Sequence, residues 1–94
     1  MIVARGEIDI KTAVELEAAL SPHASETLIL DLTAVEFIDS TGLHVLTSAR
    51  ARSAEEGGRF VVCTAEDTAV LRTLRLAGLS ADFELISSPD DLSG

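Results

Sequence analysis

The chain has 94 residues, of which 47% are hydrophobic and 24% are charged. This length supports one domain with a single core, and this composition is typical of a globular chain rather than a disordered one. Sixteen acidic and seven basic residues give a net charge of −9. This balance argues against nucleic acid as a partner, because phosphate binding needs clustered lysine and arginine. No apolar run approaches the roughly 20 residues of a membrane span, and the N-terminus lacks a signal-peptide pattern, so we expect a cytoplasmic protein.

The first half of the chain predicts a strand, a helix and a second strand. Residues 1–6 form a short β-type run. A helix is predicted over 12–20, with Thr12 and Glu15 at the spacing of a capping box. The segment Thr27–Ile38, TLILDLTAVEFI, is apolar with polar alternates and rich in β-forming residues. It is therefore predicted to be a central strand of a sheet.

The second half repeats this alternation of helix and strand. Thr64 and Asp67 give a cap signal for the later helix, and paired glycines after residue 56 end the earlier one. The predicted elements are a helix over 41–55, a strand over 59–64, a helix over 67–77, a strand over 83–87 and a short helix from Pro89.

Strands that alternate with helices at this spacing predict one α/β domain over residues 1–94. We expect a mixed central sheet of about four strands, with the segment 27–33 near its centre and the helices packed mainly on one face. Aromatic residues are scarce, so aliphatic side chains must form the core. The expected core positions are Leu16, Leu20, Ile29, Leu46, Val61, Val62, Leu71 and Leu74.

Cys63 is the only cysteine, so an intrachain disulfide is excluded. It lies in the apolar run RFVVCTA, in which no nearby basic group would lower the pKa of its thiol. We interpret it as a buried, inert side chain. The sequence predicts no cofactor and no metal site.

The junction FIDSTG joins the central strand to the following helix. The first N–H groups of a helix lack intrahelical partners, and Asp39 or Ser40 can cap them. Capping accounts for one residue, whereas this junction carries two successive hydroxyls, Ser40 and Thr41, and then Gly42. The group resembles a small, exposed surface that a ligand or partner can approach closely.

Three kinds of chemistry fit this junction. The first is a catalytic serine, Ser40, with His44 on the same helix face. It is the weaker interpretation, because only Asp39 is near enough to orient the base, the other histidine, His23, is distant, and no G-x-S-x-G pattern is present. The second is a phosphate-binding turn, which one glycine without lysine or arginine supports poorly. The third is that Ser40 is a substrate for a protein kinase, since a phosphate there meets the positive end of the helix dipole.

The motif LILDLTAVEFIDSTGLHVL, Leu28–Leu46, resembles the signature of the STAS domain, which occurs in anti-sigma factor antagonists and in the cytoplasmic tails of sulfate transporters. GEID, Gly6–Asp9, is similar to the G-x-x-D of that family, and LAGL, Leu76–Leu79, is similar to the end of its third helix. The resemblance extends over essentially the whole chain. The family usually has a further strand before G-x-x-D and a longer final helix, so we expect the exposed first strand to pair with a second copy as a homodimer.

The resemblance implies an anti-sigma factor antagonist without catalytic activity. In that branch the serine of D-S-x-G, here Ser40, is phosphorylated by an anti-sigma factor with serine-kinase activity. The unphosphorylated form binds this partner, phosphorylation ends the binding, and a phosphatase resets the switch. The expected partner-binding residues are Asp9, Asp39, Ser40, Thr41 and Gly42, although Asp9 is equally well explained as a helix cap.

Two alternatives to the antagonist remain. One is a STAS scaffold in a transporter or signalling assembly, in which D-S-T-G is a docking surface that is never phosphorylated. The other is a small hydrolase that uses Ser40 and His44.

Overall fold

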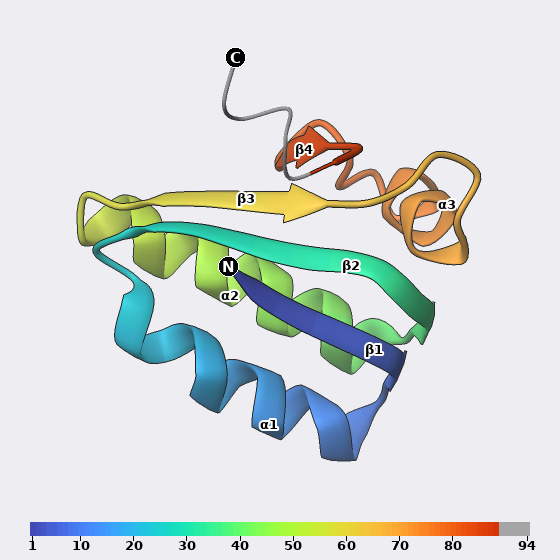
Figure 1. Ribbon diagram of the computed structural model, residues 1–94, viewed down its shortest axis with the longest axis horizontal. Helices are drawn as coiled ribbons and strands as arrows, with labels where there is room; N and C mark the ends of the chain where they lie inside the picture. Colours follow the sequence, from blue (N-terminus) through green and yellow to red (C-terminus); the bar gives the residue numbers. More distant parts are fainter. Residues whose placement is uncertain (89–94) are drawn as a thin grey trace.

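The computed structural model describes residues 1–88, so the short helix expected from Pro89 lies outside the described residues. The elements follow one another as strand and helix in alternation (Figure 1). They are β1 (Ile2–Ile8), α1 (Ile10–Leu20), the 3-10 turn η1 (Ser21–His23), β2 (Thr27–Ile38), α2 (Ser40–Glu55), β3 (Arg59–Cys63), α3 (Ala69–Leu76) and β4 (Glu84–Ile86).

The four described strands form one sheet in the order β1-β2-β3-β4. Every neighbouring pair is parallel. A helix connects each strand to the next and returns the chain to the end of the sheet at which the previous strand began. The α/β class and the inner position of β2 are confirmed. The expectation of a mixed sheet is wrong for the described strands, since none of them is joined to the next by a hairpin.

The three α-helices within residues 1–88 share one hydrophobic core. Helices α1 and α2 run along the sheet, whereas α3 lies at the carboxyl ends of β2 and β3 (Figure 1). Side chains from all three belong to one buried cluster, among them Leu16, Val45 and Leu74. Right-handed crossovers between strands in sequential order bring successive helices to the same face. Helices α1 and α2 share one face as predicted, whereas α3 lies beyond the strand ends (Figure 1).

Seven of the eight expected core positions are buried, and Ile29 is the exception because it is only half-buried. Its neighbours Leu28 and Leu30 belong to the cluster beneath the helices. Successive side chains of a strand point to opposite faces of the sheet. Ile29 therefore points to the opposite face of the sheet, where it lies beside Val61 of β3.

Helix α1 starts at Ile10, two residues before the predicted start, because Asp9 caps it. Asp9 Oδ1 accepts hydrogen bonds from the N–H groups of Lys11 and Thr12, each at 3.1 Å. Thr12 Oγ1 in turn accepts from Asp9 N at 2.9 Å. The capping box is thus formed by Asp9 and Thr12 and not by Thr12 and Glu15, in line with the preference for aspartate at the N-cap.

Helix α3 starts later than predicted, at Ala69, with Thr68 as its cap. Asp67 has a φ of 61°, a left-handed conformation that cannot belong to a right-handed helix. Helix α2 ends at Glu55 and is followed by Gly57 with a φ of 75°, as the glycine pair predicted.

Candidate functional site

The site is formed where two parallel strands end side by side. Ile8 of β1 lies opposite Ile38 of β2, and an aspartate follows each of them. The N–H of Asp39 donates to the carbonyl oxygen of Ile8 at 3.2 Å. The register therefore brings Asp9 and Asp39 together at the carboxyl edge of the sheet, each at the start of a helix.

Asp39 caps α2 and determines how the two hydroxyls are presented. Its Oδ1 accepts from the N–H of Gly42 at 3.0 Å, so Ser40 is the first residue of the helix. Ser40 is exposed, whereas Thr41 is half-buried. Of the two successive hydroxyls, Ser40 is the more accessible to an enzyme that approaches this edge.

Asp9 is held in place chiefly by Thr12, a residue that sequence reasoning assigned only to a helix cap. Hydrogen bonds from the N–H and the side chain of Thr12 lower the pKa of the Asp9 carboxyl, and the hydrogen bond from the N–H of Lys11 lowers it by a smaller amount. The Thr12 hydroxyl lies 3.1 Å from Asp9 Oδ1 and 2.8 Å from the carbonyl oxygen of Glu7. The spacing D-x-x-T was the signal in the sequence that could have identified these hydrogen bonds between Asp9 and Thr12.

Gly42 was expected to allow a binding partner to approach closely, but it allows close packing of α2 against β1 and β2 inside the protein. Gly42 is buried. A Cβ at this position would lie 2.6 Å from Ile38 Cγ1 and 2.7 Å from Ile8 Cγ2. The absence of a side chain lets the first turn of α2 rest directly on the two isoleucines that precede Asp9 and Asp39.

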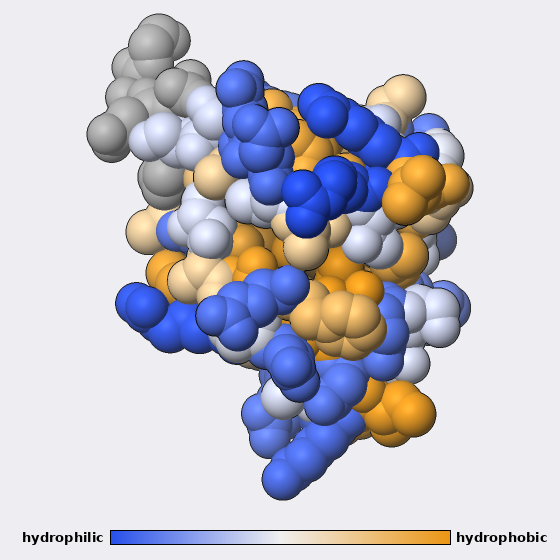
Figure 2. Space-filling view, turned by 90° about the vertical axis from the view of Figure 1, so that its right-hand side faces the viewer, coloured by the Kyte–Doolittle hydropathy of each residue, from blue (hydrophilic) through white to orange (hydrophobic). Residues whose placement is uncertain are grey.

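Figure 2 faces the carboxyl ends of the strands and shows hydrophobic surface among hydrophilic side chains. Ile10 follows Asp9 and is 72% exposed, and Val14, one turn later, is 67% exposed. Glu17 lies on the same side of α1, and its Oε1 is 3.6 Å from Nη2 of Arg52 in α2. This side of α1 therefore faces α2. Ile10 and Val14, which we call the apolar pair, therefore border the junction on the side of α1.

The arrangement does not form a catalytic dyad. His44 is exposed, and no hydrogen bond joins it to Ser40 within residues 1–88. The carboxylate of Asp39 is engaged in capping α2. His23 follows the far end of α1 and contacts Glu26 at 2.8 Å.

The described part of the chain contains no group of three or more histidine, cysteine, aspartate or glutamate side chains that could hold a metal ion. Across residues 1–88, the helices are too short or too polar to span a bilayer.

Comparison with known proteins identifies the family. The STAS domain matches residues 1–92. The anti-sigma-F factor antagonist RsfB of Mycobacterium tuberculosis (strain CDC 1551 / Oshkosh) is 36% identical in an alignment of 89 positions that covers 92% of this chain and 71% of RsfB. The anti-sigma-B factor antagonist of Listeria monocytogenes serovar 1/2a is 31% identical in an alignment of 96 positions that covers 99% of this chain and 83% of that protein.

Solved structures agree with this assignment. The crystal structure of an anti-sigma factor antagonist from Mycobacterium paratuberculosis matches with a TM-score of 0.80 and 34% identity, covering 95% of this chain and 77% of that one. Unphosphorylated SpoIIAA matches with a TM-score of 0.70 and 14% identity, covering 97% and 81%, and this likeness concerns the fold alone. With the signature motif at the β2–α2 junction and the family match over 92 residues, the chain belongs to the STAS domain family.

Proposed function

We propose that this protein is an anti-sigma factor antagonist that is switched off by phosphorylation of Ser40. The unphosphorylated form binds an anti-sigma factor with serine-kinase activity through Asp9, Asp39, Ser40 and Thr41, and a phosphatase reverses the modification. The observation that carries the proposal is an exposed serine at the first position of α2, next to two aspartates that the sheet register brings together. The names of the relatives support the same partner class.

Electrostatics explains how one phosphate can act as a switch. It adds about −1.5 to −2 charges at pH 7, next to the carboxylate of Asp39 and close to that of Asp9. The N-terminus of α2 tolerates this charge because of its dipole and its N–H groups. The added charge must be desolvated when the partner binds, and it then faces the phosphates of the nucleotide that a serine kinase holds opposite its acceptor hydroxyl. Like charges across an interface are strongly unfavourable. A loss of about 2.7 kcal/mol would weaken binding roughly a hundredfold.

The apolar pair is the proposed anchor of the same interface. Ile10 and Val14 are large, exposed side chains in the first two turns of α1, immediately after Asp9. Adjacent exposed aliphatic side chains bordered by polar groups are typical of protein-binding surfaces. We infer that the partner places apolar side chains on this pair and a basic group near Asp9.

The test combines modification and binding. Intact-mass measurement after incubation with the cognate kinase and ATP should show one phosphate on the wild type and on Thr41→Ala, and none on Ser40→Ala. In calorimetry, Ser40→Ala should bind the anti-sigma factor about as tightly as the wild type. Ser40→Asp should bind more weakly, and the phosphorylated protein most weakly.

Tighter binding by the phosphorylated form would refute the antagonist model. Phosphate retained on Ser40→Ala would show that Ser40 is not the acceptor hydroxyl. A chain that no kinase modifies would favour the unphosphorylated scaffold. We propose no catalytic activity for the chain itself, so a serine-reactive probe should leave Ser40 unlabelled.

A homodimer through the free edge of β1 is a second proposed association. A groove of about 230 Å³ runs between this strand and α1. The edge carries the charged side chains Arg5 and Glu7, and Gly6 between them has a φ of 76° that interrupts the strand register. Charges and bulges of this kind weaken pairing between edges. The dimer should therefore appear only at high protein concentration, which sedimentation equilibrium can measure.

A further inference from the structure

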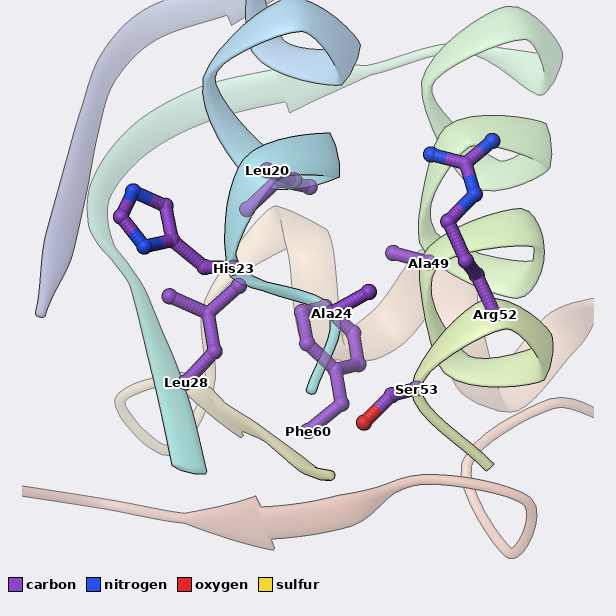
Figure 3. Close-up of a pocket in the computed structure, with 8 residues that line it drawn as sticks. All are labelled: Leu20, His23, Ala24, Leu28, Ala49, Arg52, Ser53 and Phe60. Atoms are coloured by element: carbon purple, nitrogen blue, oxygen red, sulfur yellow. The ribbon is translucent and has the colours of Figure 1, made fainter. Parts of the chain in front are cut away.

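A small cavity lies at the end of the domain opposite Ser40. It is enclosed by the last turn of α1, the second half of α2 and the first residues of β2 and β3 (Figure 3). Its apolar wall is formed by Leu20, Ala24, Leu28, Ala49 and Phe60.

Ser53 supplies a polar atom to this apolar wall. The residue is only 5% exposed, and its Oγ is buried without a hydrogen-bond partner among residues 1–88. The main-chain carbonyl of Ser53 accepts from the N–H of Gly58 at 2.9 Å, so the hydroxyl alone remains unsatisfied. In Figure 3 this oxygen points from α2 toward the side of the cavity where Phe60 lies.

We propose that the cavity binds one ordered water molecule, which hydrogen-bonds to Ser53 Oγ. An unpaired buried hydroxyl is destabilising, whereas a bridging water satisfies it at a small entropic cost. The cavity holds about 10 Å³ of water-accessible space, which is close to the minimum for a single water and too little for an organic ligand. The apolar wall makes it equally unsuitable for an ion.

Two longer side chains, Arg52 and His23, lie at the rim of the cavity, and their polar groups point away from the Ser53 hydroxyl (Figure 3). Each is near a surface carboxylate, Arg52 at 3.6 Å from Glu17 and His23 at 2.8 Å from Glu26. These polar groups therefore stay at the mouth of the cavity, and the buried hydroxyl of Ser53 is the polar atom that faces a water inside it. This role explains a serine at a position of α2 that faces the core.

High-resolution crystal structures of the wild type and of Ser53→Ala test the proposal. The wild type should show a water within about 3.2 Å of Ser53 Oγ, and the variant should lack it. A cavity without water density, or a hydroxyl turned onto a main-chain carbonyl of α2, overturns the proposal.

Thermal unfolding gives an independent readout, with Ser48→Ala on the same helix as the control for helix propensity. If the hydroxyl is hydrated, Ser53→Ala should raise the Tm no more than Ser48→Ala does. A clearly larger rise would mean that the native hydroxyl is unpaired and the cavity dry, which contradicts the proposal.

Discussion

Replacement of Gly42 by alanine tests the inference that α2 rests directly on the ends of β1 and β2. The new Cβ would lie 2.6 Å from Ile38 Cγ1 and 2.7 Å from Ile8 Cγ2. Both isoleucines are buried, at 3% and 2% exposure, so neither can move into solvent. The first turn of α2 or the two strand ends must shift instead.

The expected magnitude follows from two opposing terms. Alanine is favoured over glycine within a helix by about 1 kcal/mol. Overpacking of a close-packed core costs about 1–3 kcal/mol, and two contacts shorter than 3.0 Å at buried side chains indicate the upper part of that range. The net loss should be about 2 kcal/mol. In a domain of this size that lowers the Tm by roughly 8–16 °C.

Urea and thermal unfolding followed by circular dichroism measure this change. Ser48→Ala on the same helix reports the effect of helix propensity without a clash, and it should be neutral or slightly stabilising. A Gly42→Ala protein as stable as the wild type, or more stable, would refute the argument. In that case α2 would not be in contact with the two isoleucines as described, and a glycine at this position would need another explanation.

Three further predictions concern the surface around Asp9. Thr12→Val should cost about 1 kcal/mol in unfolding free energy by loss of the capping box, while Thr12→Ser keeps the hydroxyl and should retain most of the stability in urea titration. The folded pKa of Asp9 is lowered, so the stability it contributes is present at neutral pH and is lost as the pH falls below the ordinary pKa of aspartate and through the folded value. The Tm difference between wild type and Asp9→Asn should therefore shrink in acid, and a constant difference would contradict this. Ile10→Ser should weaken anti-sigma factor binding at least tenfold, whereas Leu76→Ser, at a residue that is 90% exposed on α3, should not. Equal effects of the two variants would rule out the apolar pair as an anchor.

The amino-acid sequence determined the succession of strands and helices, because that succession depends on local periodicity and on stop signals. The segment Thr27–Ile38 is one strand as predicted, and α2 ends before Gly57. The sequence also identified the D-S-T-G junction, since a hydroxyl pair between two apolar runs is visible without any knowledge of contacts. The starts of α1 and α3 were less well predicted, because several neighbouring residues in each case can serve as caps.

Only the tertiary structure decided which segments meet. Parallel pairing of β1 with β2 brings Ile8 opposite Ile38, and this register places Asp9 next to Asp39 although 30 positions separate them in the sequence. The same packing explains Gly42. The sequence suggested that this glycine lets a partner approach, whereas in the structure it packs against two buried isoleucines. Strand order and register depend on side chains distant in the sequence, so no local pattern contains them.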